Sequence, residues 1–205
     1  HRFADVLRHR HLRLGVLAIF LYVGAEVSIG SFMISYLSMP SIGAISEAAA
    51  AGYVSLYWGG AMIGRFAGFL LLRRLDPRRL LGAFAVIAAL LLSATMLTHG
   101  RPALWSIVAI GLFNSIMFPN IFALGIEKMG AMTDKASSLL VMAIVGGAIV
   151  PVLQGLLADH IGVQHAFVLP LACYAYIVYY GFAGSRVDID GAPQGVSSNA
   201  AMARH

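Results

Sequence analysis

Six long apolar stretches alternate with short polar links along the chain. They cover residues 14–38, 51–72, 80–98, 103–126, 136–158 and 166–183. A helix of about 20 residues crosses a hydrocarbon core about 30 Å thick, because each residue rises about 1.5 Å. None of the stretches shows the strict alternation of a transmembrane strand, which excludes a closed barrel. The pattern therefore predicts an all-α, polytopic membrane protein: a six-transmembrane-helix bundle in the lipid bilayer.

Composition supports this class of protein. Hydrophobic residues make up 60% of the 205 residues and charged residues 11%, whereas a soluble domain has about 25% charged residues. Residues 1–13 form a basic segment, and residues 184–205 lose hydrophobicity and gain Gly, Ser and Asp. That second segment is predicted to be a disordered cytoplasmic tail. The chain starts with His1 rather than Met, which suggests a fragment or a processed chain.

The positive charges lie on one side of the predicted path through the membrane. Those near the stretches are Arg2, Arg8, Arg10, Arg13, Arg73, Arg74, Arg78, Arg79, Lys128, Lys135 and Arg186. The opposite side carries only Arg101. This positive-inside asymmetry predicts that both termini are cytoplasmic. It also accounts for the net charge of +5 without a nucleic-acid partner.

A carboxylate interrupts the first apolar stretch. Glu26 lies about 18 Å along its helix from Leu14, and no other formal charge occurs between Leu14 and Leu37. A charge at that depth costs at least about 2.5–3.5 kcal/mol on insertion scales. We therefore expect Glu26 to face the bundle interior, where it accepts hydroxyls from a bound polyol, exchanges a proton, or pairs with Arg65. Tyr22 shares its face, one helical turn earlier.

Arg65 is the second polar anomaly. It precedes the basic link by about two helical turns, which places it roughly 12 Å into the membrane and about 8 Å short of the depth of Glu26. A direct ion pair between the two side chains would only just span that gap. Snorkelling toward the cytoplasmic face, or a hydrogen bond to a helix end, is the favoured interpretation.

The fourth stretch contains the third anomaly, the segment "FNSIMFPNIFALGIE". Pro119 removes a backbone donor and frees a carbonyl one turn earlier. Asn114 and Asn120 flank it, and amides suit sugar hydroxyls because they both donate and accept. A broken helix of this kind is typical of transporter binding sites. A structural kink with interhelical hydrogen bonds explains the same residues.

Two further side chains are candidates for substrate binding. Gln154 in the fifth stretch supplies another amide. Tyr57 is the deepest tyrosine of the second stretch. Aromatic residues near a span end usually anchor the membrane interface, and stacking on a sugar ring is the alternative for Tyr57.

Small residues recur every four positions in two of the stretches. They are Gly60, Gly64 and Gly68 in the second, and Ala143, Gly147, Pro151 and Gly155 in the fifth. Helices in lipid approach closely along such stripes. The stripes predict either tight static packing or a hinge, with Gly147 and Pro151 as gating positions.

The chain shows no signature of an enzyme. It has no His–Cys metal spacing, no Gly-rich phosphate loop and no plausible catalytic triad. A single cysteine, Cys173, cannot form an internal disulfide. We therefore predict neither catalysis nor a cofactor.

Four segments together resemble a known family. They read "YVGAEVSIGSF", "GRFAG", "FNSIMFPNIFALGIE" and "MAIVGGAIVPVLQGLLAD". In order and spacing they are similar to the carboxyl-terminal six helices of the fucose and glucose/galactose permeases, in the major facilitator superfamily. The likeness runs from about residue 14 to residue 183. A weak likeness between the first three and the last three stretches agrees with a 3+3 inverted repeat.

The resemblance implies a monosaccharide as substrate and a proton as coupling cation. It implies alternating access in the bacterial inner membrane, with a missing N-terminal six-helix half as partner. The coupling carboxylates of the family are expected mainly in that half, so Glu26 is assigned to sugar binding or a supporting hydrogen bond. A truncated, non-transporting fragment whose polar residues only hold helices together is the alternative. A small channel of oligomerised half-bundles is a third hypothesis.

Overall fold

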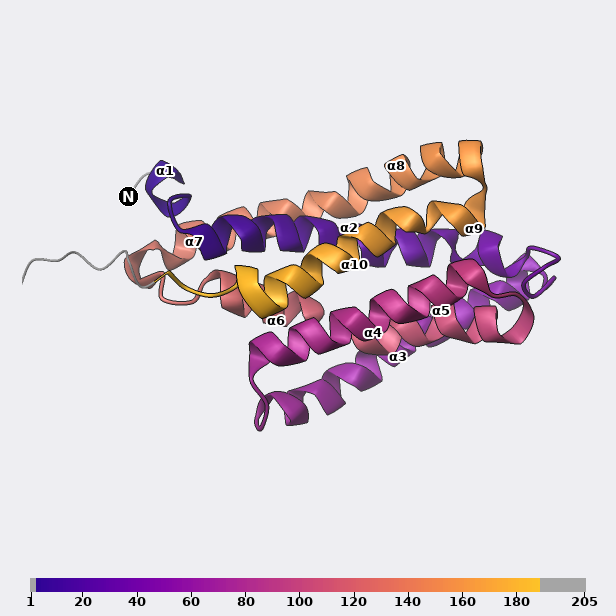
Figure 1. Ribbon diagram of the computed structural model, residues 1–205, viewed down its shortest axis with the longest axis horizontal. Coiled ribbons are helices and arrows are strands. Elements are labelled where there is room, and N and C mark those ends of the chain that lie inside the picture. Colours follow the sequence, from indigo (N-terminus) through magenta and orange to yellow (C-terminus); the bar gives the residue numbers. More distant parts are fainter. Residues whose placement is uncertain (1–2, 189–205) are drawn as a thin grey trace, which may run out of the picture.

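The computed structural model describes residues 3–188, and the regular structure within that range is entirely helical (Figure 1). The elements are α1 Phe3–Val6, α2 Arg10–Leu37, α3 Glu47–Leu72, α4 Pro77–Leu97, α5 Gly100–Asn114, α6 Met117–Gly125, η1 Gly130–Met132, α7 Thr133–Met142, η2 Ala143–Val145, α8 Gly146–Ile161, α9 Val163–Ala166, α10 Val168–Tyr179 and η3 Tyr180–Gly184. They make six helical segments long and apolar enough to cross a membrane. The predicted all-α, six-span architecture is confirmed.

All six spans begin a few residues before the apolar stretches that predicted them. The first turns of α3 and α4 contain charged residues and are held by capping side chains. Ser46 Oγ accepts a hydrogen bond from the backbone N–H of Ala49 at 3.2 Å, and Asp76 Oδ1 accepts one from the N–H of Arg78 at 3.3 Å. Such caps satisfy amides that the helix itself leaves unpaired. Hydropathy detects the membrane-spanning part of a helix and misses a capped polar turn.

Three of the six spans are interrupted, and the sixth is divided into α9, α10 and η3. The fourth breaks between Asn114 and Met117, next to Pro119, where the sequence predicts a break. The fifth changes from α7 to α8 through one turn of tighter helix at Ala143–Val145. Pro151 lies inside α8, which continues past it. The interruption of the fifth span therefore precedes Pro151 rather than occurring at it.

The long helix α2 runs through the middle of the bundle (Figure 1). It packs against α8, α10, α6 and α3, while α5 packs against both α3 and α4. Glycines allow the closest approaches. A Cβ added to Gly111 of α5 would lie 2.1 Å from the carbonyl oxygen of Tyr57, and one added to Gly146 of α8 would lie 2.0 Å from that of Phe20. Neither helix pair could approach so closely with a larger residue.

The small-residue stripes lie at these contacts. On α3, a Cβ at Gly64 would lie 2.4 Å from the Leu112 carbonyl oxygen, and one at Gly68 would lie 2.0 Å from Ile116. On α8, a Cβ at Gly147 would lie 3.0 Å from Val23. The stripe on α3 therefore packs against the fourth span, and the stripe on α8 packs against α2.

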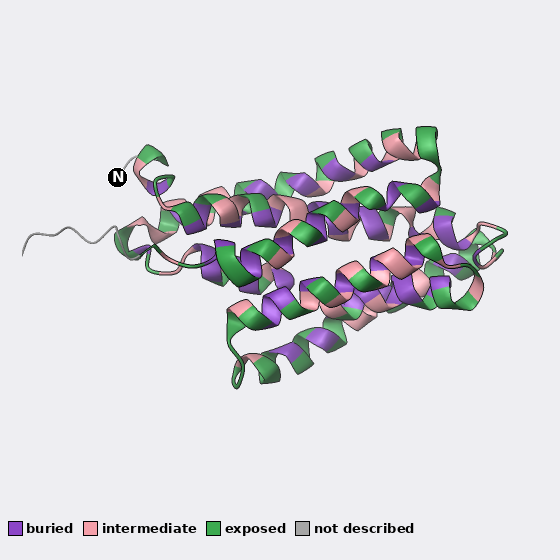
Figure 2. Cartoon of the chain, in the orientation of Figure 1, coloured by how far each residue is buried: buried purple, intermediate pink, exposed green. Residues whose placement is uncertain are grey.

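Exposed apolar residues gather on α3 and α8, and Figure 2 shows exposed positions along both helices. They include Met62, Ile63, Phe66, Phe69 and Leu70 on α3, and Val152, Leu153 and Leu156 on α8. Of the predicted tail, residues 189–205 lie outside the described residues. Gly184 and Ser185 are buried, so the packed bundle reaches beyond the start predicted for that tail.

Candidate functional site

Asn114 is the centre of a buried polar network at the break in the fourth span. Its Nδ2 donates to the Tyr57 hydroxyl at 2.8 Å, and its Oδ1 accepts from the Tyr174 hydroxyl at 2.6 Å. Its backbone carbonyl accepts from the Tyr22 hydroxyl at 2.9 Å. All four residues are at most 2% exposed. One asparagine thus connects α5 with three other helices: α2, α3 and α10.

The helix break makes these contacts available. A continuous helix would use the Asn114 carbonyl for the backbone N–H four residues later, whereas here Tyr22 donates to it. Pro119 has no N–H for the carbonyl of Ser115. Arg65 donates to that carbonyl instead, from Nε at 3.4 Å. Side chains of α2 and α3 therefore satisfy two carbonyls that the break leaves free, as burial in an apolar medium requires.

Glu26 lies beside this network. Its backbone carbonyl accepts a hydrogen bond from the Tyr57 hydroxyl at 3.2 Å. Tyr22 lies one turn before Glu26 on the same face of α2. Glu26 is partly exposed, unlike the network residues. Within residues 3–188 it forms no ion pair with Arg65. Of the three interpretations of Arg65 (ion pair, snorkelling, and hydrogen bond to a helix end), the structure contains the hydrogen bond, to the Ser115 carbonyl at the end of α5.

Gln154 lies apart from these hydrogen bonds. It is fully buried in α8, and neither amide atom has a partner among the described residues. One turn before it, Val150 touches Gly24 of α2. The same register one turn later sets Gln154 opposite Ser28, which is also buried without a partner within the described range. Both therefore lie on the helix pair α2 and α8 without forming a hydrogen bond to each other.

Asn120 lies in a different polar cluster, at the end of the bundle that carries the α3–α4 turn. Its Nδ2 donates to the carbonyl of Pro77 at 3.0 Å. It also lines a cavity of about 490 Å³ together with Arg78 and Glu127. The structure therefore brings Tyr22, Glu26, Tyr57 and Asn114 together, whereas Asn120 and Gln154 take other partners or none.

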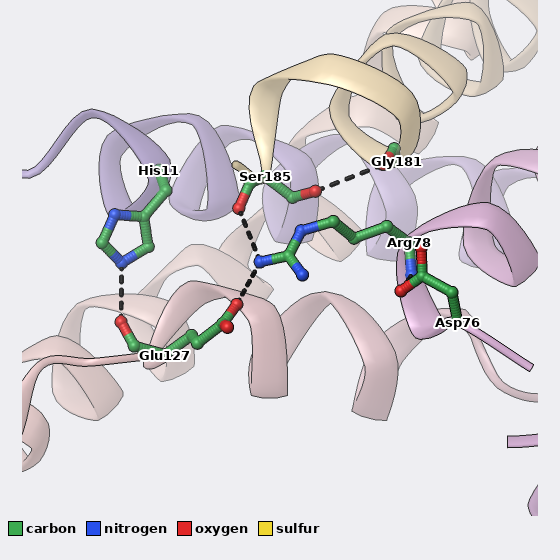
Figure 3. A network of polar contacts seen from close by, with 6 residues as sticks. All are labelled: His11, Asp76, Arg78, Glu127, Gly181 and Ser185. Atoms are coloured by element: carbon green, nitrogen blue, oxygen red, sulfur yellow. Dashed lines mark hydrogen bonds and ion pairs between the residues drawn. The ribbon is translucent and has the colours of Figure 1, made fainter. Parts of the chain in front are cut away.

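An ion pair organises this end of the bundle (Figure 3). Arg78 forms a hydrogen-bonded ion pair with Glu127, and its Nη2 also donates to the Ser185 carbonyl at 3.4 Å. The His11 Nε2 lies 2.9 Å from the carbonyl oxygen of Glu127. A carbonyl only accepts, so this ring nitrogen carries the hydrogen. The ends of α2, α4, α6 and η3 are joined through these groups.

Comparison with known proteins decides the family. The chain is 52% identical over 179 residues to the glucose/galactose transporter of Brucella abortus. It is 36% identical over 174 residues to the L-fucose-proton symporter of Escherichia coli. A crystal structure titled as the major facilitator superfamily transporter FucP, in the outward conformation, superposes with a TM-score of 0.80 at 35% identity over 84% of this chain. The chain belongs to the major facilitator superfamily.

The match covers only part of each relative. The alignment includes 87% of this chain and 43% of the Brucella transporter, and 84% and 40% for the Escherichia coli symporter. A second FucP structure, of a variant of the Escherichia coli protein, gives a TM-score of 0.83 over 87% of this chain and 43% of that one. The chain thus spans less than half the length of these relatives and matches their C-terminal part. No family model matches it.

These comparisons confirm the resemblance found in the four sequence segments. The superfamily relatives are named as transporters, in agreement with the prediction that the chain is not an enzyme. Within residues 3–188, no group of three His, Cys, Asp or Glu side chains is placed to hold a metal ion. The polar groups of the network are hydroxyls, an amide and one carboxyl group, which suit hydrogen bonding to a polar solute.

Sequence reasoning missed two groups in this major facilitator bundle. Tyr174 is one of several tyrosines in an apolar stretch, and only its position near the middle of the sixth span set it apart. The partner of Arg78 was also missed. Glu127 closes the fourth span on the predicted basic side. A lone carboxylate among basic residues was the available signal for that ion pair.

Proposed function

We propose that this chain is the C-terminal half-bundle of a monosaccharide transporter of the bacterial inner membrane, with both termini cytoplasmic. The whole transporter would couple sugar uptake to protons by alternating access. Relatives named as a glucose/galactose transporter and an L-fucose-proton symporter support the substrate class. The observation that carries the proposal is the partly exposed Glu26 beside the Asn114 network.

In the proposed site, Glu26 accepts hydrogen bonds from sugar hydroxyls. A carboxylate accepts at two oxygens and forms stronger hydrogen bonds than a neutral group. Asn114 offers the second hydrogen of Nδ2, because the first goes to Tyr57. Tyr22 and Tyr57 position these groups through bonds to the Asn114 carbonyl and the Glu26 carbonyl. A preformed arrangement limits the ordering that binding would otherwise require.

The proposal needs a second bundle. The apolar faces of α3 and α8 are exposed in this chain, and the relatives have more than half their length outside the match. We propose that the missing N-terminal half supplies the other wall of the sugar cavity. Rocking of two bundles around a central site gives alternating access. Pro119, Gly147 and Pro151 lie in the fourth and fifth spans, near the interruption of each, and are the proposed bending positions.

The test joins this chain to the N-terminal half of the Escherichia coli fucose symporter and measures sugar binding and uptake. We expect Glu26→Gln to weaken sugar binding by about tenfold, the loss of a charge-assisted hydrogen bond. Glu47→Gln is the matched control, since Glu47 lies in the first turn of α3 on the surface. The isolated chain should catalyse no uptake in liposomes. Equal affinity in the Glu26 and Glu47 variants would refute the assignment of Glu26.

The alternative is a non-transporting fragment whose polar groups only hold helices together. The bonds of Asn114 to Tyr57 and Tyr174 favour it, because they lie wholly inside the bundle. The two functions differ in what Asn114→Ser does in the joined transporter. A purely structural role predicts lower stability with unchanged sugar affinity, whereas the proposed site predicts lower affinity as well.

A further inference from the structure

A second, smaller cavity lies beside the Arg78–Glu127 pair, between the start of α4 and η3. Its volume is about 170 Å³, and it is lined by Asp76, Arg78, Arg79, Gly181, Phe182 and Arg186. Three arginines around one small cavity at the end of a transmembrane bundle favour a negatively charged occupant. Nothing in the proposed sugar site uses this cavity.

Some of the charged groups around the cavity already have partners. Arg78 is paired with Glu127 and also donates to the Ser185 carbonyl, so its guanidinium points away from Asp76 (Figure 3). Asp76 accepts from the Arg78 backbone as the cap of α4. Arg79 and Arg186 are exposed, and neither forms an ion pair within residues 3–188. The three arginines carry three positive charges, and Asp76 and Glu127 carry two negative charges. The net charge of these five groups is therefore +1.

Close backbone packing brings the two free arginines to the same cavity. A Cβ added to Gly181 would lie 2.7 Å from the backbone nitrogen of Gly82 and 3.2 Å from the carbonyl of Arg78. A glycine is required at this contact between η3 and α4. The turn that follows is held by Ser185, whose N–H donates to the Tyr180 carbonyl at 2.8 Å. Arg186 is therefore positioned by ordered backbone rather than by a free chain end.

An apolar surface leads from the cavity along the bundle. Phe182 is 44% exposed at the cavity itself. Val86 and Leu90 of α4 are 37% and 65% exposed, and they follow Gly82 at four-residue spacing on one face. The ring of Phe182 packs over Gly82. A cationic pocket is thus continuous with an apolar face of α4 that runs toward the bilayer core.

We propose that this cavity binds the headgroup phosphate of an anionic phospholipid. Arg79 and Arg186 hold the phosphodiester, and an acyl chain lies over Phe182, Val86 and Leu90. One phosphodiester carries the single negative charge that the cavity leaves unbalanced, and arginine binds phosphate oxygens through paired N–H groups. Basic pockets between transmembrane helices recognise anionic headgroups at this depth.

The test uses the full chain, purified in detergent and incubated with phosphatidylglycerol or phosphatidylcholine. Native mass spectrometry counts the lipids retained. We expect phosphatidylglycerol to be retained over phosphatidylcholine, and Arg79→Gln/Arg186→Gln to lower its retention by about tenfold. Arg73→Gln/Arg74→Gln is the matched control, because it removes the same charge from the same end of the bundle outside this cavity. Arg79→Lys/Arg186→Lys should recover part of the binding.

Three outcomes would overturn the proposal. The first is equal loss in both glutamine variants, which would indicate general attraction to a basic surface. The second is equal retention of both lipids by the unaltered chain. The third is full displacement of phosphatidylglycerol by glycerophosphoglycerol or inorganic phosphate, which would mean that the cavity binds a free phosphate group and the apolar face contributes nothing. The unfolding midpoint of each variant checks that the bundle is intact.

Discussion

At the scale of single residues, the structure explains how an asparagine is accommodated among apolar helices. Asn114 is 1% exposed, and two buried tyrosine hydroxyls depend on its amide. Asn114→Leu leaves the Tyr174 hydroxyl without its acceptor, whereas the Tyr57 hydroxyl keeps its bond to the Glu26 carbonyl. A buried unsatisfied group costs about 1–3 kcal/mol. We therefore expect the free energy of unfolding to fall by about that amount, measured by circular dichroism in mixed detergent and sodium dodecyl sulfate.

The matched comparison is Tyr174→Phe, which removes one donor and leaves the rest of the network in place. It should lower the free energy of unfolding by about 0.5–1.5 kcal/mol, the net contribution of one hydrogen bond. The double variant Asn114→Leu/Tyr174→Phe should cost less than the sum of the two, because the residues interact directly. Strict additivity would show that the 2.6 Å bond between them contributes nothing to stability.

A second residue-scale prediction concerns the carbonyl that Pro119 leaves free. Arg65 donates to the Ser115 carbonyl, so Arg65→Leu should destabilise the bundle by about 1 kcal/mol, a value reduced by the exposure of Arg65. In a Pro119→Ala background, residue 119 has its own N–H for that carbonyl. Arg65→Leu should then cost measurably less. An unchanged cost in both backgrounds would mean that Arg65 stabilises the bundle through some other contact.

The candidate site was only partly predictable from the sequence, for a physical reason. Glu26, Asn114 and Pro119 were found because a polar group or a proline inside an apolar stretch is unfavourable in lipid. Hydropathy says nothing about which side chains satisfy them. Tyr174 was missed for this reason, since tyrosine is common in membrane helices and its partner is distant in sequence. Asn120 and Gln154 matched the same pattern, yet in the structure they lie outside the Asn114 network.

At the scale of helices, glycine determines where two spans can touch. Gly111 of α5 lies against the backbone of Tyr57 on α3, and an added Cβ would lie 2.1 Å from its carbonyl oxygen. Gly111→Ala should therefore force α3 and α5 apart and destabilise the bundle by about 1–3 kcal/mol. Gly59→Ala on α3 is the control, because a Cβ there meets nothing within 4 Å. That change should be neutral or stabilising, since alanine favours a helix.

A thermal or detergent unfolding midpoint measures both glycine variants. If Gly111→Ala unfolds at the same midpoint as Gly59→Ala, the contact between α3 and α5 is looser than the structure has it.

The helical spans themselves were predictable, because their length and apolar character follow directly from the bilayer thickness. The turn of tighter helix at Ala143–Val145 was not, because three apolar residues carry no local signal for a change of helix type.

At the scale of the whole molecule, the bundle has one polar end rich in cations. The start of α2, the α3–α4 turn and the end of the sixth span lie at the same end of the bundle (Figure 1). This end carries the basic residues of α2 and of the turn, Arg186, and the Arg78–Glu127 pair. At the opposite end, Arg101 lies in the first turn of α5, directly after the α4–α5 link. The chain passes from one end to the other six times. Charge bias in short links sets the orientation of such a chain, so we expect the cation-rich end to be cytoplasmic.

Cysteine labelling tests this orientation, because the chain has one cysteine and it is 3% exposed. In a Cys173→Ser background, Leu75→Cys marks the α3–α4 turn and His99→Cys marks the α4–α5 link, both at exposed positions. A membrane-impermeant maleimide applied to intact cells should label the cysteine at 99 and spare the one at 75. Inverted vesicles should give the reverse pattern. Labelling of position 75 from outside would contradict this orientation. It would place the cation-rich end, and with it the proposed phospholipid cavity, in the outer leaflet.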